Sequence, residues 1–356
     1  MDKEIPSHRW SISPLITSHL HLYFDMLSLL SFFLLIHVYL TYGAPTTKEP
    51  TFTVETKLLQ AAINCPQTSQ VAQDSVVLIV PGTGEQASSF FRKTLGQLLE
   101  KNKYHPCYLD VPNDSVGDMQ INAEYVSYAI HSLFRSSNSK IRVVAHSQGC
   151  TNVQWALTFW SDRRKEVASF VALGPAWDGT EIAGLVNRVR ASLTGGKMVA
   201  SVLQQTTGSH LLQALKDHGG TKMLVPTTTV MTNTDEIVLP YESGNMAGAT
   251  NIVLQSKNLC PHRLVDHFTL VTDAISQYAM LNAFEKGGSG MTDLEALEKN
   301  KETLCANKLP QFTSVSAGIS FTTQSLMSAI QTVVTGKGKS TIVTEEPPLM
   351  PYAKAK

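Results

Sequence analysis

The sequence lacks several features that would place it in common protein classes. Its 29 Lys and Arg residues are balanced by 29 Asp and Glu, so no basic excess favours a nucleic-acid partner. It has no C-x-x-C pair and no His/Cys cluster at zinc spacing, so no metal is expected. It also has no internal repeat and no Pro-, Gly- or Ser-rich linker between residues 60 and 350. These absences favour one folded domain.

The N-terminal residues differ from the rest of the chain. The apolar run Leu27–Tyr42 is shorter than the ~18 residues expected of a membrane span, and small residues such as Gly43 accompany its end, as at a signal-peptidase site. We therefore expect residues 1–44 to be an extension with a cleaved signal peptide, and the mature protein to be secreted. The alternative is an uncleaved anchor that tethers the protein to a membrane. Residues 45–59 are predicted to be a tether, and residues 60–356 the folded domain.

Secretion affects the interpretation of the cysteines. An oxidising route favours disulfides, and an odd count leaves at least one cysteine without an intrachain partner. Asn113-Asp114-Ser115 is an N-x-[ST] sequon, which makes Asn113 a candidate glycan site on a loop. The five cysteines are Cys65, Cys107, Cys150, Cys260 and Cys305.

Short apolar runs alternate with helical patterns along the chain. Val76–Val80 is five consecutive apolar residues, four of them β-branched, which is typical of a strand buried on both faces. The alternation predicts an α/β fold with a mostly parallel central sheet and helices on both faces. Further strands are expected at 107–111, 141–145, 170–173, 223–231 and 252–255, and helices at 88–100, 118–134, 148–160, 182–193 and 322–334.

The strongest local signal is Ala145-His146-Ser147-Gln148-Gly149, between a predicted strand and a predicted helix. Small residues two before and two after the serine let strand and helix pass closely, as in the nucleophile elbow G-x-S-x-G. The sharp turn would expose the Ser147 hydroxyl for attack. The alternative is a serine that only caps the helix.

A nucleophilic serine needs a base, and in this class the partners follow in the order Ser, acid, His. Asp235 comes directly after a β-branched run, where the acid is expected; the alternative is a turn residue. Two histidines follow it. His262 lies next to Cys260-Pro261, which favours a loop surface, whereas His267 precedes a helical stretch and is the predicted base.

Pro81-Gly82-Thr83-Gly84 follows the first strand and has two interpretations. Gly82, Gly84 and Ala87 fit the dinucleotide-binding pattern G-x-G-x-x-G/A. The same turn could supply the Thr83 N–H to an oxyanion hole whose other donor is the N–H of Gln148. The dinucleotide interpretation needs an acid about 20 residues further on, and Asp110 comes late. We therefore favour the oxyanion hole, with no cofactor, and keep an oxidoreductase as the less favoured alternative.

Several motifs in order strengthen this interpretation. IVPGTG, AHSQG with NVQWALTFW after it, LQQTTGS, TDEIV, VDH and LMPYA resemble the Candida antarctica lipase B-like fungal lipase family, across about residues 60–356. The resemblance implies an α/β-hydrolase fold, secretion and serine lipase or esterase activity. It assigns Ser147, Asp235 and His267 as the triad, and Thr83 and Gln148 as oxyanion donors. It also places Gln205 and Ile237 in the substrate pocket.

The resemblance has further implications and some departures. It implies disulfides Cys65–Cys107 and Cys260–Cys305, which leaves Cys150 as a free thiol. His146 replaces a tryptophan of the lipase that typifies the family, so we expect it to line the substrate pocket; the alternative is that it bonds to a neighbouring loop. The expected partner is a lipid or small ester, at a lipid–water interface or in solution, and the expected state is a monomer. An acyltransferase on the same site is the other alternative.

Overall fold

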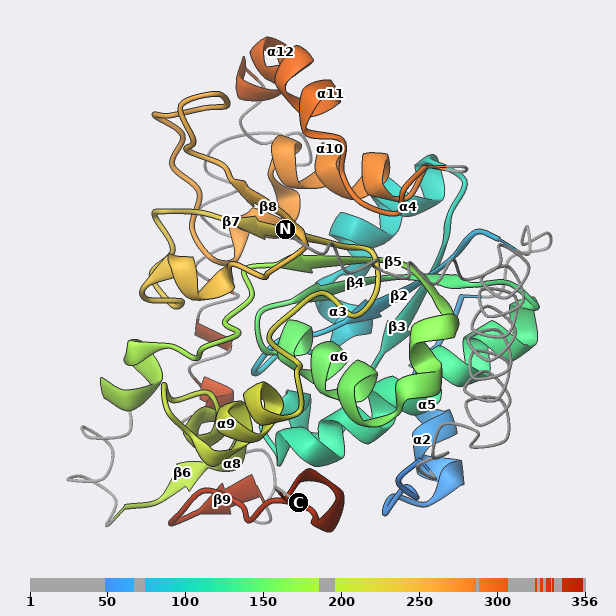
Figure 1. Ribbon diagram of the computed structural model, residues 1–356, viewed down its shortest axis with the longest axis vertical. Coiled ribbons are helices and arrows are strands. Elements are labelled where there is room, and N and C mark those ends of the chain that lie inside the picture. Colours follow the sequence, from blue (N-terminus) through green and yellow to red (C-terminus); the bar gives the residue numbers. More distant parts are fainter. Residues whose placement is uncertain are drawn as a thin grey trace, which may run out of the picture. The chain divides into compact units, whose positions relative to one another are not determined.

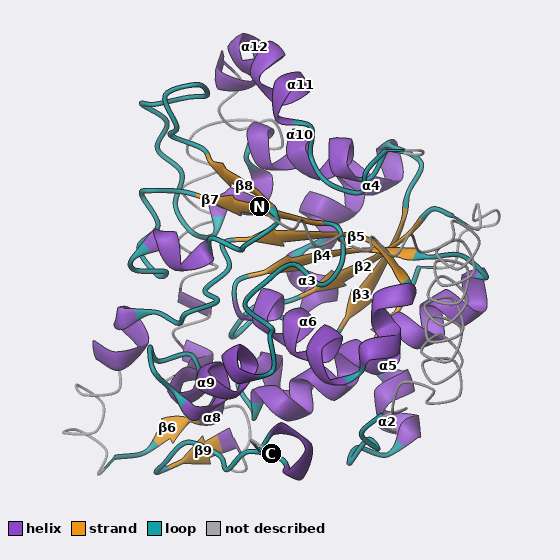
Figure 2. Cartoon of the chain, viewed as in Figure 1, coloured by secondary structure: helices purple, strands orange, loops and turns teal. Residues whose placement is uncertain are grey.

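A seven-stranded sheet forms the centre of the fold (Figures 1 and 2). The computed structural model describes residues 49–66, 74–185, 196–285, 288–306 and 341–354, with a few residues between 324 and 335. The chain divides into the units Met1–Glu49 and Pro50–Lys356, and the sheet belongs to the second. The expected signal peptide, within residues 1–44, lies outside the described residues.

The sheet confirms the predicted mostly parallel α/β architecture. The order is β1-β3-β2-β4-β5-β7-β8, with β1 antiparallel to β3 and every other pair parallel. Parallel strands all end at the same edge, so the loops that follow them meet there. The strands are β1 (Ile63–Asn64), β2 (Val76–Val80), β3 (His105–Leu109), β4 (Ile141–His146), β5 (Val167–Leu173), β7 (Thr227–Met231) and β8 (Thr250–Val253).

Helices cover both faces of the sheet because its central strands are apolar on both faces. In β2, Leu78 and Val80 join one core cluster, whereas Val77 and Ile79 join the other. Helices α5 (Met119–Ser137) and α6 (Gln148–Phe159) pack on the first face. Helices α4 (Gln97–Lys101) and α10 (Ala274–Ala283) pack on the second (Figure 1), and α3 (Ala87–Phe90) contributes Ala87 to the same core cluster. Burial on both faces is what the unbroken apolar run predicted.

Local chemistry explains how some elements differ from their predicted bounds. Asp118 caps α5 as expected, since its carboxylate accepts the Gln120 N–H at 2.9 Å. The predicted helix 88–100 is instead α3, a π-helical segment Arg92–Gly96 and α4. Gly96 lies against Tyr108, whose hydroxyl would be 2.0 Å from any Cβ there. The close approach of that ring requires glycine at the irregular turn.

Three other predicted elements are shorter than expected or only partly described. The strand predicted at 223–231 begins at Thr227. The helix predicted at 182–193 is described only as far as residue 185, and most of the one predicted at 322–334 lies outside the described residues. Smaller elements among the described residues include α2 (Thr56–Ala61), α8 (Ala200–Gln204), α9 (His210–Asp217), α11 (Leu294–Lys299), α12 (Lys301–Ala306), and the two-stranded ribbon of β6 (Met198–Val199) and β9 (Ile342–Val343).

The segment predicted as a tether makes specific contacts from Pro50 onward. The Trp160 indole donates to the Pro50 carbonyl at 2.8 Å, and the Phe52 and Trp160 rings stack with centroids 5.6 Å apart. The Thr53 N–H donates to Glu124 at 2.7 Å. These contacts hold the start of the unit on α5 and α6. The limits of tether and domain stay predictions.

Both expected disulfides are present, linking Cys65 to Cys107 and Cys260 to Cys305. The remaining cysteine, Cys150, is free and buried as predicted, and burial raises the pKa of its thiol. Its sulfur donates weakly to the Ala145 carbonyl at 3.3 Å, behind the elbow. Among the described residues, none of the helices has both the length and the apolar character needed to cross a bilayer.

Candidate active site

Ser147 occupies a strained turn between β4 and α6. Its φ of 53° and ψ of −128° lie outside the regions that non-glycine residues normally adopt. Its side chain makes no capping hydrogen bond to α6, which argues against the helix-cap alternative. The Ser147 N–H donates to the Leu173 carbonyl at 2.8 Å and so fixes the turn against β5.

Close backbone packing explains the small residues around the serine. A Cβ on Gly149 would lie 2.5 Å from the Pro81 carbonyl oxygen, and one on Gly82 would lie 2.8 Å from the Ser147 Cβ. Real Cβ atoms do not approach so closely, so both positions require glycine. The elbow and the turn after β2 are therefore in direct contact.

Asp235 and His267 form a buried pair across 32 residues of sequence. Asp235 follows β7, His267 follows β8, and the Asp235 Oδ2 lies 2.8 Å from the His267 Nδ1. The other carboxylate oxygen accepts the N–H groups of Ile237 and Val238 at 2.9 and 2.7 Å. Nδ1 facing a carboxylate leaves Nε2 to exchange a proton. His267 Nε2 is buried and has no hydrogen-bond partner among the described residues.

Pairing also shifts the pKa values of both side chains, lowering that of Asp235 and raising that of His267. Burial alone would raise the pKa of Asp235, but the charge and hydrogen bond of His267, with two backbone N–H groups, outweigh burial and lower that pKa. Burial alone would lower the pKa of His267, but Asp235 and two other carboxylates outweigh burial and raise it. Asp235 is thus held as the carboxylate.

Ser147 and His267 lie in the same small region. The Ser147 N–H is bonded to Leu173, and the next residue, Gly174, touches the His267 ring: a Cβ there would be 3.0 Å from Cε1. The residue before the serine also reaches His267, because a His146 ring nitrogen lies 3.0 Å from the His267 carbonyl oxygen. The structure therefore brings together the three residues predicted as a triad.

His262, Asp266 and Asp110 lie outside the buried Asp235–His267 pair. His262 is exposed, as its position after Pro261 predicted. Asp266 accepts the N–H groups of Phe268 and Thr269 at 2.9 and 2.8 Å and so serves its own turn. Asp110, which the dinucleotide interpretation would use, accepts the Ser88 N–H at 2.8 Å at the start of α3.

The turn after β2 faces the elbow. Gln148 is the first residue of α6, so its N–H has no acceptor within the helix. In the turn, the Gly82 N–H donates to Glu85 and the Gly84 N–H to the Asp114 carbonyl, at 2.6 and 2.8 Å. Thr83 lies between these two anchored residues. Its N–H and that of Gln148 are the two donors that the sequence predicted for an oxyanion.

Thr83, Gln148 and Gln205 share one hydrogen-bonded cluster. The Thr83 hydroxyl donates to Gln148 Oε1 at 2.6 Å, and the Gln205 amide donates to both, at 2.9 and 3.0 Å. Thr83 and Gln205 are half-buried, as is Ser147, whereas Gln148 is buried. The cluster links the elbow to the segment after α8 and orients the Thr83 side chain.

His146, Ile237 and Asn113 occupy three different settings. His146 is only 1% exposed, and both ring nitrogens have protein partners, which is the arrangement of the loop-bonding alternative. Ile237 is half-buried beside the acid, and Asn113 is exposed at a left-handed φ of 56°. Pocket roles for His146 and Ile237, and a glycan on Asn113, stay predictions.

Sequence reasoning missed two carboxylates at the site. Glu85 lies at 2.7 Å from a His146 ring nitrogen, and Glu236 accepts the His267 N–H at 3.0 Å. Glu236 adjoins the acid in sequence, which is a weak signal. Nothing in the sequence marks Glu85, because its partner His146 is 61 residues away.

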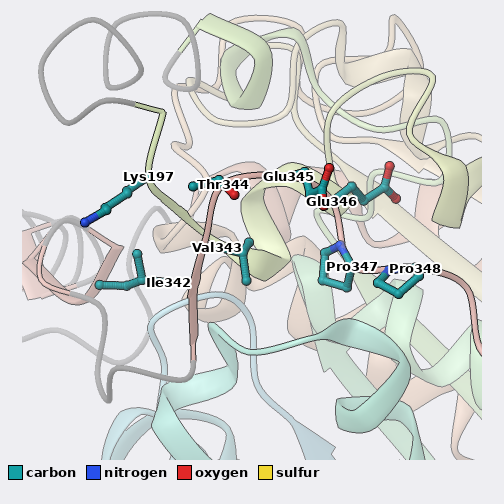
Figure 3. Close-up of a pocket in the computed structure, with 8 residues that line it drawn as sticks. All are labelled: Lys197, Ile342, Val343, Thr344, Glu345, Glu346, Pro347 and Pro348. Carbon is teal, nitrogen blue, oxygen red and sulfur yellow. The ribbon is translucent and has the colours of Figure 1, made fainter.

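A pocket of about 620 Å³ lies elsewhere, beside the β6–β9 ribbon. It is lined by Lys197 and residues 342–348, with Glu345 and Glu346 on one side and two prolines next to them (Figure 3). None of the residues predicted for the active site lines it.

A serine on a strained strand–helix turn, beside a buried Asp–His pair at one edge of a mostly parallel sheet, defines an α/β-hydrolase. No protein-family model matches the chain. Lipase B of Pseudozyma antarctica is 31% identical over an alignment of 323 residues that covers 87% of this chain and 88% of that protein. The chain therefore belongs to the lipase B-like family and is a hydrolase of the lipase and carboxylesterase class.

Solved structures agree. Aspergillus fumigatus lipase B superposes with a TM-score of 0.77 at 27% identity, covering 88% of this chain and 75% of that one. The Bacillus licheniformis lipase BlEst2 with its propeptide gives 0.50 at 16% identity, covering 65% and 54%, and supports the fold alone.

Proposed function

We propose that this protein is a secreted serine lipase or esterase in which Ser147 is the nucleophile, His267 the general base and Asp235 its orienting acid. The single observation that carries the proposal is the 2.8 Å Asp235–His267 pair beside the elbow. Thr83 and Gln148 are proposed as oxyanion donors. The substrate is a carboxylic ester, and the mechanism needs no cofactor.

The chemistry follows from these positions. Ser147 Oγ attacks the ester carbonyl carbon while its proton passes to His267 Nε2. The carbonyl oxygen becomes an oxyanion and accepts the two backbone N–H groups; each such donor is worth about 3–4 kcal/mol in the transition state. The tetrahedral species collapses, and the departing alkoxide takes the proton from Nε2. Water then attacks the acyl-enzyme by the same route and releases the carboxylic acid.

A fluorophosphonate ester tests the nucleophile directly, because its phosphorus is attacked as an ester carbonyl is. We expect one phosphonyl group per protein, located by peptide mass spectrometry on Ser147. Exposed hydroxyls do not compete, since they lack a base. Labelling spread over several serines, or none at position 147, would contradict the assignment. Hydrolysis rates across acyl-chain lengths then separate lipase from esterase, and added alcohol shows whether acyl transfer outcompetes water.

Exposed apolar residues support a lipid–water interface as the place of action. Leu264 is 86% exposed and lies three residues before His267, whereas Leu239 is 38% exposed and follows Asp235 by four. The Leu239 carbonyl accepts the Glu181 N–H at 2.9 Å, and Leu185, in the helical turn after Glu181, is also exposed. Apolar side chains in the loops that carry the acid and base suit a surface that meets lipid.

Leu264→Asp should therefore reduce hydrolysis of emulsified triglyceride roughly tenfold, since burying one Leu in lipid is worth about 1.5–3 kcal/mol. Hydrolysis of a dissolved short-chain ester should stay unchanged. Leu58→Asp is the matched control, because Leu58 is 50% exposed on α2. An equal loss on both substrates would point to damage at the site and contradict the interfacial role.

A further inference from the structure

Glu85 is a buried carboxylate that the proposed mechanism does not use. It is only 3% exposed, yet both of its oxygens have partners in the active site. Oε2 accepts the Gly82 N–H at 2.6 Å, directly before the proposed oxyanion donor Thr83. Oε1 lies 2.7 Å from the His146 Nδ1, directly before the nucleophile. A buried carboxylate is costly unless it is paired, so this position requires an explanation.

The other ring nitrogen of His146 has a partner that can only accept a hydrogen bond. Nε2 lies 3.0 Å from the His267 carbonyl oxygen, and a carbonyl can only accept a hydrogen bond, so Nε2 carries a hydrogen. Nδ1 then faces a carboxyl oxygen, and one shared proton lies between the two. The Glu85–His146 pair thus connects Gly82, in the turn after β2, to the backbone of His267, the proposed base.

The surroundings of the pair strengthen these bonds. The rings of Phe90, Phe91 and Phe268 each lie with centroids 6.2 Å from the His146 ring. Apolar walls lower the local dielectric and make a satisfied hydrogen bond stronger and a broken one more costly. The His267 backbone is held on both sides, because its carbonyl bonds to His146 and its N–H donates to Glu236 at 3.0 Å.

We propose that Glu85 and His146 are positioning residues that hold the oxyanion turn and the catalytic histidine in one fixed arrangement. The inference rests on the proposed triad and adds the device that aligns it. Glu85 fixes Gly82, and through it the direction of the Thr83 N–H. His146 fixes the His267 carbonyl, and through it the place of the ring. Neither residue touches the reacting atoms, and the pair acts on turnover through alignment.

The test compares variants of Glu85 in the full mature protein. Glu85→Ala removes both bonds and should lower kcat at least tenfold on a dissolved ester, because small misplacements of reacting groups cost up to ~100-fold. KM should change less than about threefold, since the pair is closed off from solvent. Glu85→Gln should keep kcat within about threefold of wild type: its amide nitrogen donates to Nδ1 and its oxygen accepts from Gly82.

A second His–Glu pair provides a matched control. His131 Nδ1 lies 2.7 Å from Glu166 Oε1, the same atoms at the same distance, and Glu166 directly precedes β5 at the opposite edge of the sheet from the elbow. Glu166→Ala should lower the melting temperature and leave kcat unchanged. A purely structural role for Glu85 would give the same result in Glu85→Ala.

Two outcomes would overturn the inference: wild-type kcat in folded Glu85→Ala, or an equal loss of kcat in Glu85→Gln and Glu85→Ala. If Glu85→Ala does not fold, Glu85→Met fills the same volume without hydrogen bonds and takes its place in both comparisons. Phosphonate labelling of wild type distinguishes a wrong positioning role for Glu85 from a wrong assignment of the triad. A wild-type protein labelled at Ser147, with unaltered kcat in Glu85→Ala, refutes the positioning role alone.

Discussion

Replacing Ser147 with alanine should lower kcat for a dissolved activated ester by about 10⁵–10⁶-fold, because the members of a triad act as a unit. The protein should remain folded. The Ser147 side chain makes no capping bond, and alanine bears the same backbone strain at φ 53° as serine does. The measurement is kcat for a nitrophenyl ester, with the circular dichroism spectrum and melting temperature as checks on folding.

Two further variants make this result specific. His267→Ala should lose nearly as much activity as Ser147→Ala, since the hydroxyl is inert without its base. His262→Ala should keep wild-type activity, because that histidine is exposed. Near-wild-type turnover in Ser147→Ala, or a large loss in His262→Ala, would show that the nucleophile or the base has been assigned wrongly.

The sequence predicted those parts of the site that depend on chain order. Parallel strands end at one edge, so residues directly after β2, β4, β7 and β8 must meet there. Ser147 was predicted from the elbow pattern, Asp235 from its place after a predicted strand and His267 from the chain order Ser, acid, His, and the resemblance to lipases assigned all three. The small residues of the elbow could likewise be predicted, because the required close packing is a property of the turn itself.

The sequence did not predict contacts that depend on how distant side chains meet. The Glu85–His146 pair needs a carboxylate in one loop and an imidazole in another at matching depth, and neither residue is unusual by itself. The close approach of Tyr108 to Gly96, in the π-helical segment before α4, likewise joins residues from two separate elements. Periodicity predicts an element and its exposed face, whereas these details follow from the tertiary packing.

The second large effect concerns the charge of Asp235. Asp235→Asn keeps the size of the side chain but places an amide where the carboxylate accepted a hydrogen bond from the His267 Nδ1–H. The imidazole of His267 then loses its orienting partner and favours the wrong tautomer, so kcat at neutral pH should fall by about 10⁴-fold. Steady-state kinetics of the purified variant on the same dissolved ester would measure this loss.

The pH profile gives a separate readout. His267 must be neutral to accept the serine proton, so kcat/KM of wild type should fall as pH drops through the raised pKa of His267, with an inflection above the ordinary 6.5. Since the Asp235 charge helps to hold that pKa up, the residual activity of Asp235→Asn should have its inflection at lower pH. Asp266→Asn is the control: its carboxylate accepts the N–H groups of Phe268 and Thr269, and its charge is not among those that raise the His267 pKa. Its inflection should therefore stay with wild type.

The Asp235–His267 pair should also stabilise the fold, and each residue should lose its contribution in a different pH range. The lowered pKa of Asp235 contributes stability above its unfolded value of about 3.9, and this is lost as pH falls through the folded pKa. The raised pKa of His267 contributes stability below about 6.5, and this is lost as pH rises through its folded pKa. The melting temperatures of wild type and Asp235→Asn should therefore differ most near pH 5–6 and differ less on both sides. A difference that is constant across pH, together with an unmoved kinetic inflection, would show that Asp235 does not control the charge of His267.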